Sequence, residues 1–247
     1  MTQLRVGVAG ALGRLGRVAC TAVEAADDLH LTAAFTRRGG ERLSDVLGIG
    51  GDARTYDELG DFVAAGLDVI VDCTVYPATV DVVRAAIDAG IPPVIGATGW
   101  TDEDLLVLSD RCDEAGVPAM LVPNFSFGAA LMMRFSAQAA RVFPHAEIVE
   151  LHHDAKRDTP SGTSRLTARR IHETGAPLPP IHSVRLPGLL AHQETIFGSI
   201  GETLTIRHDS LARESYGPGI VAAVRAVRAQ AGLVLGLDTI LDRMLAS

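Results

Sequence analysis

The chain has 247 residues, of which 47% are hydrophobic, and its formal net charge is −8. This length is enough for one large domain or for two smaller ones, each with a substantial core. An acidic chain lacks the broad basic surface with which nucleic-acid binders displace counterions from phosphates, so we expect no nucleic-acid partner. A small anion can still bind, because the local charge of a pocket need not follow the net charge.

The three cysteines, Cys20, Cys73 and Cys112, are widely spaced and form no Cys-x-x-Cys pair. This spacing disfavours a disulfide framework and a thiolate zinc site, and it is typical of small buried side chains in a reducing compartment. The sequence begins with a strand-like run without the features of a secretory signal, and no apolar stretch approaches the roughly 20 residues of a membrane helix. We therefore expect a cytoplasmic protein with no membrane partner.

The first half of the chain alternates strand-like and helix-like segments. Short apolar runs predict buried parallel strands, and the stretches between them predict helices. The expected strands are residues 4–9, 29–36, 67–74, 93–97 and 117–122, and the expected helices are residues 13–26, 79–89 and one that begins at Thr101. This alternation predicts an α/β domain with a Rossmann-like, doubly wound parallel sheet.

After Phe125 the pattern changes to that of a second, α+β domain. The expected helices are residues 128–142 and 163–174, the expected strands are residues 146–153, 181–186, 194–199 and 202–209, and the closing segment from Pro218 is expected to be helical.

A glycine-rich turn follows the first expected strand and opens the first helix. It reads Gly10-x-x-Gly13-x-x-Gly16. Glycines at such a turn let the chain bend sharply and let its amides approach a pyrophosphate at the helix N-terminus. Glycines also serve plain structural turns, but the position after a buried strand favours a nicotinamide dinucleotide. The expected contacts are Gly10, Ala11, Leu12, Gly13, Arg14 and Leu15.

The end of the second expected strand indicates which dinucleotide binds. Domains that select NAD usually carry an acid about 20 residues after the glycine turn, whereas this chain has Thr36 followed by Arg37 and Arg38. Arginines there can pair with a 2′-phosphate, so we expect a preference for NADPH, with NADH as the alternative cofactor. A solvated pair of loop arginines is the other interpretation.

Two later loops lie where a dinucleotide would pass. Gly96-Ala97-Thr98-Gly99 follows one expected strand, and Pro123-Asn124-Phe125 follows another. In open parallel sheets, ligands lie beyond the carboxyl ends of the strands. The small residues of these loops would let a nicotinamide ribose approach the backbone.

The densest group of reactive side chains lies at residues 150–163, where His152, His153 and Lys156 fall within five residues. A metal site is one interpretation, but adjacent strand residues point to opposite faces, so the two histidines converge poorly on one ion. A polar strand end at the surface is a second interpretation. The third is proton transfer, because histidine titrates near neutrality and a lysine near other cations can become a proton donor.

The residues that follow suggest an anion site beside these proton donors. Ser161 or Thr163 is suited to cap the next helix, whose first amides would bind a carboxylate. This combination favours the reduction of an imine or a conjugated double bond in a small carboxylate. The alternatives are a reductase acting on another imine or keto acid and a non-catalytic regulator that senses a dinucleotide.

Over essentially its whole length the chain resembles the dihydrodipicolinate reductases. The resemblance is carried by Glu-x-His-His-x-x-Lys-x-Asp-x-Pro-Ser-Gly-Thr at residues 150–163, with support from the glycine turn, Asp72-x-Thr74 and Pro123-Asn124-Phe125. Residues 191–194 and 201–210 resemble the actinobacterial members. The resemblance implies NAD(P)H-dependent reduction of a small dicarboxylate, 4-hydroxy-tetrahydrodipicolinate, through dihydrodipicolinate to tetrahydrodipicolinate in lysine and diaminopimelate biosynthesis.

The resemblance also implies roles for individual residues. His152 would be the proton donor and acceptor and Lys156 a proton donor. The implied substrate contacts are His153, Gly162 and Thr163, and the expected helix start adds Ser161. The implied cofactor contacts are Gly10 to Leu15, Arg37, Gly96, Ala97, Thr98, Val122, Pro123, Asn124 and Phe125. The chain departs from the usual family residues at Leu15, Cys73, Ala97 and Thr159, and Thr159 adds a hydroxyl beside the substrate loop.

Finally, the resemblance implies a homotetramer with two domains per chain. Residues 1–126 and 217–247 would form the dinucleotide-binding domain. Residues 127–216 would form the substrate-binding and tetramerisation domain, with a mixed open sheet.

Overall fold

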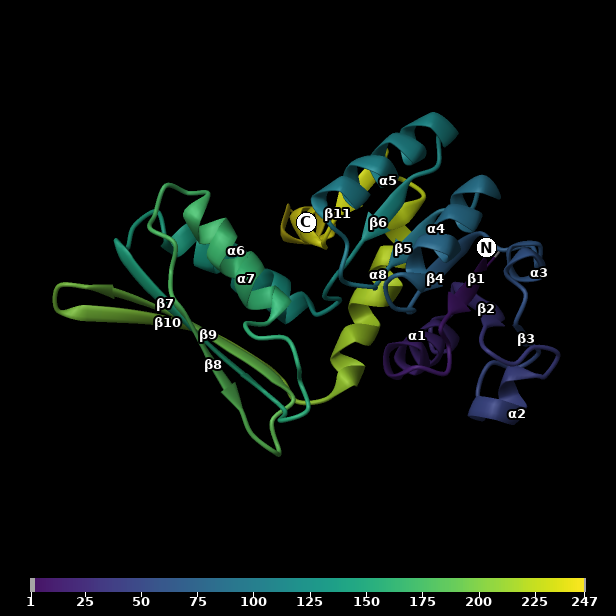
Figure 1. Ribbon diagram of the computed structural model, residues 1–247, viewed down its shortest axis with the longest axis horizontal. Helices are drawn as coiled ribbons and strands as arrows, with labels where there is room; N and C mark the ends of the chain where they lie inside the picture. Colours follow the sequence, from purple (N-terminus) through teal and green to yellow (C-terminus); the bar gives the residue numbers. More distant parts are fainter. Residues whose placement is uncertain (1–2, 247) are drawn as a thin grey trace. The chain divides into compact units, whose positions relative to one another are not determined.

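The computed structural model describes residues 3–246. They form two compact units (Figure 1), one made of the residues up to Phe125 together with those from Tyr216 onward, the other of Ser126–Ser215. None of the helices within residues 3–246 combines the length and the apolar character that crossing a membrane requires.

The first unit is built on a seven-stranded sheet in the order β11-β6-β5-β4-β1-β2-β3. Every neighbouring pair of strands is parallel, which confirms the predicted doubly wound α/β architecture. The strands are β1 (Leu4–Ala9), β2 (Leu29–Phe35), β3 (Arg54–Tyr56), β4 (Val69–Asp72), β5 (Pro93–Ile95), β6 (Ala119–Leu121) and β11 (Leu233–Leu235).

Helices cover both faces of this sheet (Figure 1). On one face, α3, α4 and α5 pack on the strands through two apolar clusters, and on the other face α1 and α8 pack against each other. The helices of this unit are α1 (Arg14–Glu24), α2 (Leu43–Leu47), α3 (Leu59–Val63), α4 (Ala78–Asp88), α5 (Asp102–Ala115), α8 (Gly217–Val227) and α9 (Asp238–Ala246).

Helix α5 shows how local sequence sets an element boundary. The Thr101 hydroxyl accepts the Asp104 N–H at 3.1 Å, and the Asp104 carboxylate accepts the Thr101 N–H at 2.8 Å. This reciprocal cap satisfies two amides that the helix itself leaves open. Gly116 ends the helix in the left-handed region at φ 63°, where glycine has no steric penalty. The predicted helix start at Thr101 is confirmed.

Two parts of the first unit differ from the sequence prediction. The closing segment is not helical throughout, because β11 lies between α8 and α9 and pairs with β6. A three-residue apolar strand shows no periodicity that would separate it from a helix. Between residues 40 and 66, where no element was predicted, the chain forms α2, β3 and α3, which are five, three and five residues long.

The second unit contains a four-stranded mixed sheet in the order β10-β9-β7-β8. β8 runs parallel to β7, and the other pairs are antiparallel, so the predicted mixed sheet is confirmed. Its strands are β7 (His145–His152), β8 (Ile181–Arg185), β9 (Ala191–Ser199) and β10 (Glu202–Ser210), its helices are α6 (Phe127–Ala139) and α7 (Gly162–His172), and the short 3₁₀ helix η1 (Arg213–Tyr216) follows.

Both helices of this unit pack on the same face of the mixed sheet. Ile148 and Phe197 on this face meet Ala140 and Ile171 in one buried cluster. Glu150 lies two residues after Ile148, and the strand register pairs it with Gln193 on β9. Because side chains alternate along a strand, Glu150 is also carried on the helix-covered face. The strand pattern thus places a carboxylate in the apolar interior of the unit.

Candidate active site

The glycine turn between β1 and α1 leaves no space for side chains at Gly10 and Gly16. Gly10 adopts φ 74°, and the Gly13 N–H donates to its carbonyl oxygen at 2.9 Å. A Cβ on Gly16 would lie 2.1 Å from that oxygen, whereas the only neighbour of a Cβ on Gly13 would be the same oxygen, at 3.1 Å. Gly13 is also the N-cap of α1 and offers no side chain to its amides. These features fit a pyrophosphate held by backbone amides.

Three of the predicted cofactor segments meet at Gly96. A Cβ on Gly96 would lie 2.8 Å from Phe125 Cε2 and 3.0 Å from Leu15 Cδ2. Gly10–Leu15, Gly96–Thr98 and Val122–Phe125 follow β1, β5 and β6, which are parallel strands of one sheet. The structure therefore brings these segments to a single edge, where dinucleotides bind in open α/β sheets.

Thr36 and the two arginines after it form a tight loop at the end of β2. Thr36 is buried, and its hydroxyl donates to the Arg38 carbonyl at 2.6 Å and accepts the Arg38 N–H at 3.1 Å. Both hydrogen bonds of the Thr36 hydroxyl are therefore made to the Arg38 backbone within the loop. The side chains of Arg37 and Arg38 are exposed and make no hydrogen bond or ion pair within residues 3–246. Both guanidinium groups are available to an anionic ligand.

Asp72 fixes the loop that follows β4 beside the glycine turn. Its carboxylate accepts the Thr74 N–H at 3.0 Å, the Thr74 hydroxyl at 2.6 Å and the Thr79 hydroxyl. Burial raises the pKa of Asp72 above its ordinary value, against the opposing effect of these hydrogen bonds. The loop in turn contacts Gly10, because a Cβ there would lie 2.8 Å from the Cys73 carbonyl oxygen.

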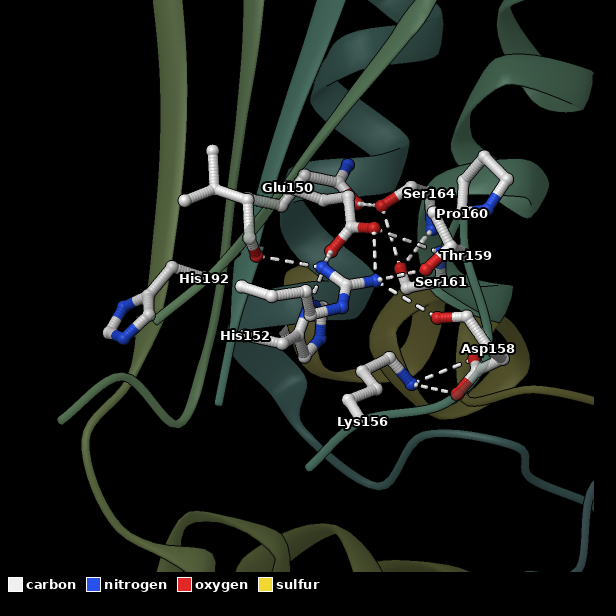
Figure 2. Close-up of polar contacts among 12 residues, drawn as sticks. Glu150, His152, Lys156, Asp158, Thr159, Pro160, Ser161, Ser164 and His192 are labelled. Atoms are coloured by element: carbon white, nitrogen blue, oxygen red, sulfur yellow. Dashed lines mark hydrogen bonds and ion pairs between the residues drawn. The ribbon is translucent and has the colours of Figure 1, made fainter. Parts of the chain in front are cut away.

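In the second unit, three residues contribute four hydrogen bonds to the buried carboxylate of Glu150 (Figure 2). Its Oε1 accepts Arg185 Nη2 at 2.7 Å and the Ser161 N–H at 3.2 Å. Its Oε2 accepts Arg185 Nη1 at 2.8 Å and is also hydrogen-bonded to His152 Nδ1. A single carboxylate therefore joins the predicted proton-transfer histidine to the start of α7.

Arg185 extends this network to the loop before α7. Besides Glu150, its Nη2 donates to the Asp158 carbonyl at 2.9 Å and to Thr159 Oγ1 at 3.3 Å. The Thr159 hydroxyl is thus a partner of Arg185. The guanidinium links β7, β8 and the 158–161 loop.

Lys156 lies in the turn after β7 and is tied to the same loop. Its Nζ donates to both carboxylate oxygens of Asp158, at 2.7 and 2.8 Å. Burial raises the pKa of Asp158, but the hydrogen bond and charge of Lys156 outweigh this and hold it below its ordinary value. The Lys156 N–H donates to the His153 carbonyl at 3.1 Å, which places His153 in the same turn.

The charge states of Glu150 and His152 follow from burial and from their partners. Burial raises the pKa of Glu150, yet its hydrogen bonds with Arg185 and His152 and the charge of His152 help to outweigh it and lower the value to about 2. Burial lowers the pKa of His152, Glu150 opposes this, and the charges of Lys156 and Arg185 add to the decrease. At neutral pH Glu150 is therefore a carboxylate and His152 a neutral imidazole.

The start of α7 is capped by Ser161, one of the two predicted caps, and Thr163 lies inside the first turn. Ser161 Oγ accepts the Ser164 N–H at 3.1 Å. Gly162, the first helical residue, is exposed, and a Cβ on it would have no neighbour within 4 Å. The helix N-terminus thus opens onto free space, which suits a carboxylate ligand.

A polar chain supports this helix start, and neither this chain nor Arg185 was predicted from the sequence. The Ser164 hydroxyl donates to Gln193 Oε1 at 2.7 Å, and Gln193 Nε2 donates to the Thr167 hydroxyl at 2.9 Å. Arg185 could have been found from the sequence, because it is a charged residue on the same face of the expected strand 181–186 as Ile181. Figure 2 shows His192 pointing away from this group, on the other face of β9. Within residues 3–246, no three His, Cys, Asp or Glu side chains are grouped to hold a metal ion.

Comparisons with known proteins match both units to the same family. The family model described as dihydrodipicolinate reductase, N-terminus, matches residues 4–125, and the model for the C-terminus of the same family matches residues 128–241. The two matches together cover nearly the whole chain.

Several full-length relatives carry the same function name. The 4-hydroxy-tetrahydrodipicolinate reductase of Desulfitobacterium hafniense is 39% identical over 267 residues, covering 98% of this chain and 100% of the relative. That of Mycolicibacterium vanbaalenii is 40% identical over 261 residues, covering 97% and 99%. Among solved structures, a dipicolinate-bound dihydrodipicolinate reductase from Paenisporosarcina sp. TG-14 is 34% identical with a TM-score of 0.83, covering 97% of this chain and 100% of that one.

Proposed function

Because the chain belongs to the dihydrodipicolinate reductase family, we propose that His152 and Lys156 carry out the proton transfer of that family's reaction. The chain is an oxidoreductase of lysine and diaminopimelate biosynthesis. It reduces 4-hydroxy-tetrahydrodipicolinate, through dihydrodipicolinate, to tetrahydrodipicolinate with a nicotinamide dinucleotide.

The dinucleotide binds along the strand edge formed by the glycine turn and the loops after β2, β5 and β6. When bound, its reduced nicotinamide supplies the hydride. We propose a preference for NADPH, because Arg37 and Arg38 are exposed and uncommitted, and because the loop at the end of β2 has no carboxylate among Thr36, Arg37 and Arg38 to bind a ribose hydroxyl. NADH remains the alternative cofactor.

The dicarboxylate binds in the second unit, with its carboxylates on the amides of Gly162 and Thr163 and beside His153. The sequence also predicted Ser161 as a substrate contact, but its N–H is donated to Glu150, so Ser161 caps the helix instead. The observation that carries this assignment is the Glu150 carboxylate, which accepts both the Ser161 N–H and His152 Nδ1. It joins the anion-binding amides to a neutral imidazole, whose Nε2 exchanges a proton with the substrate. Lys156, with its ammonium held by Asp158, donates the proton that balances the hydride.

The test follows NADPH oxidation on freshly generated hydroxy-tetrahydrodipicolinate, with NADH in parallel. We expect Lys156→Ala to lower kcat about 100-fold or more, the usual contribution of a positioned proton donor, while dinucleotide binding persists. Glu173→Gln, an exposed change at the far end of α7, is the control. Near-normal turnover of Lys156→Ala would refute the assigned role.

A panel of imine and keto-acid substrates at fixed NADPH tests the two alternative functions. Faster turnover of another imine or keto acid would indicate a reductase of that substrate. The absence of turnover on every member of the panel would favour a non-catalytic dinucleotide sensor.

We also propose a cytoplasmic homotetramer that assembles through the face of the mixed sheet opposite α6 and α7. This face carries Val149, Leu151, Val184 and Ile196, each half-buried in the single chain. Apolar side chains on a sheet face favour burial against a second copy. Light scattering after gel filtration should give the mass of four chains, and Val149→Asp should lower it. A monomeric wild-type protein would contradict the proposal.

A further inference from the structure

We propose that Glu150 and Arg185 are positioning residues for proton transfer: Arg185 fixes the Glu150 carboxylate, and Glu150 holds His152 with its proton on Nδ1, so that Nε2 alone exchanges a proton with the substrate. The inference rests on the proposed role of His152. It assigns two residues that touch neither the substrate nor the dinucleotide in this scheme.

The first step is the orientation of Glu150 by Arg185. The two guanidinium nitrogens Nη1 and Nη2 donate to the two carboxylate oxygens at 2.8 and 2.7 Å. Such a paired contact fixes the plane of the carboxylate as well as its position. Arg185 is itself held by the Val184 carbonyl at 2.8 Å and the Asp158 carbonyl at 2.9 Å. The carboxylate therefore cannot rotate without breaking several bonds at once.

The second step is the choice of imidazole tautomer. An ionised carboxylate has no proton to donate, so the His152 nitrogen that contacts Glu150 must carry the hydrogen. That nitrogen is Nδ1. A neutral imidazole holds one N–H, which leaves Nε2 as a lone-pair acceptor. Glu150 thereby selects the nitrogen that is available to the substrate.

The third step concerns the charges that act on His152. Three charged groups do so: Glu150 on its own strand, Arg185 on β8 and Lys156 in the following turn, which is itself paired with Asp158. Burial, Lys156 and Arg185 lower the pKa of His152, and Glu150 alone opposes them. Removing the charge of Glu150 therefore lowers the pKa of His152 further.

The fourth step links the same carboxylate to substrate binding. Glu150 Oε1 accepts the Ser161 N–H, and Ser161 caps α7. The distance from the proton-transfer histidine to the carboxylate-binding amides is thus set through a single side chain. Because a misplacement of about 1 Å in a reacting group can cost 100-fold in rate, we expect the loss of Glu150 to affect kcat more than KM.

The experiment compares Glu150→Gln and Arg185→Lys with Glu173→Gln, which makes the same acid-to-amide change in an exposed ion pair with Arg169. Thermal unfolding confirms that each variant folds. For Glu150→Gln we expect the acid-side pKa of the kcat/KM profile to fall by about one unit, with a larger loss in kcat than in KM. Arg185→Lys keeps the charge but loses the planar fork, so kcat should fall without a comparable shift of the profile.

A second readout does not depend on turnover. Imidazole ¹⁵N spectra of the substrate-free protein report which nitrogen carries the proton, and His152→Asn identifies the signals of His152. We expect the Nδ1–H form in the wild type and in Glu173→Gln, and a mixture of both tautomers in Glu150→Gln. A folded Glu150→Gln with an unchanged tautomer and pH profile would overturn the inference, while the role of His152 would stand. Undiminished turnover by His152→Ala would instead overturn the role of His152.

Discussion

Gly16 packs against the carbonyl oxygen of Gly10 so closely that a Cβ on Gly16 would lie 2.1 Å from it. The first turn of α1 and the loop that precedes it therefore meet at a point where no side chain fits. This contact keeps the amides at the start of α1 aimed at the predicted pyrophosphate position. At Gly10 and Gly16 the glycine pattern of the sequence is thus a requirement of backbone packing.

The first prediction is that Gly16→Ala destabilises the first unit and weakens dinucleotide binding. The new methyl group would overlap backbone atoms, which cannot move aside as a flexible side chain does, so we expect a cost of about 1–3 kcal/mol. Thermal unfolding and titration with 2′,5′-ADP measure the two effects. Gly60→Ala is the matched control, because a Cβ there meets nothing within 4 Å in helix α3. A Gly16→Ala protein as stable as Gly60→Ala would contradict the argument.

The second prediction concerns the choice between NADPH and NADH. Arg37→Ala and Arg38→Ala remove the exposed guanidinium groups at the end of β2. Because hydrogen bonds to charged groups contribute about 1.5–3 kcal/mol, the KM for NADPH should rise at least about tenfold while that for NADH changes little. Arg84→Ala, which removes an arginine paired with Asp81 on α4, should alter neither. Equal effects on both cofactors would show that the pair does not recognise a 2′-phosphate.

The third prediction tests the buried polar chain under the start of α7. Gln193→Ala removes one hydrogen bond each from the hydroxyls of Ser164 and Thr167, which keep their bonds to Ser161 Oγ and to the Thr163 carbonyl. Because a buried hydrogen bond contributes about 0.5–1.5 kcal/mol, losing two should lower the midpoint of urea unfolding. In the double variant, adding Ser164→Ala to Gln193→Ala should lower the free energy of unfolding by less than Ser164→Ala does alone. The reason is that the two residues share one hydrogen bond. Strictly additive effects on the free energy of unfolding would indicate that the hydrogen bonds of Ser164 and Gln193 are not coupled.

The sequence predicted those parts of the site that are local in the chain. The glycine turn, the His152–Lys156 segment and the Ser161 cap each lie within a few residues, and their chemistry follows from residue type and spacing. The Arg185–Glu150 pair spans 35 residues, and it depends on the parallel register of β7 and β8, which no local pattern specifies. Gln193 was missed for the same reason, since its partners lie on a helix packed against the sheet.

The last prediction follows from the lowered pKa of Glu150, which is about 2 in the fold against an ordinary value of 4.5. A group with a depressed pKa binds protons more weakly in the folded state, so it stabilises the fold fully above the unfolded value. This contribution is lost as the pH falls from about 4.5 toward 2. Circular dichroism of the wild type at constant ionic strength should therefore show stability falling across this window.

Glu150→Gln should show a shallower loss over the same pH range, because an amide does not titrate, even though Arg185 loses a charged partner and the variant is less stable at pH 7. Glu173→Gln should retain the wild-type slope, since Glu173 is exposed and its ion pair is solvated. If Glu150→Gln and the wild type lose stability in parallel between pH 4.5 and 2, the acid sensitivity of the fold arises elsewhere and Glu150 is not held as a buried carboxylate.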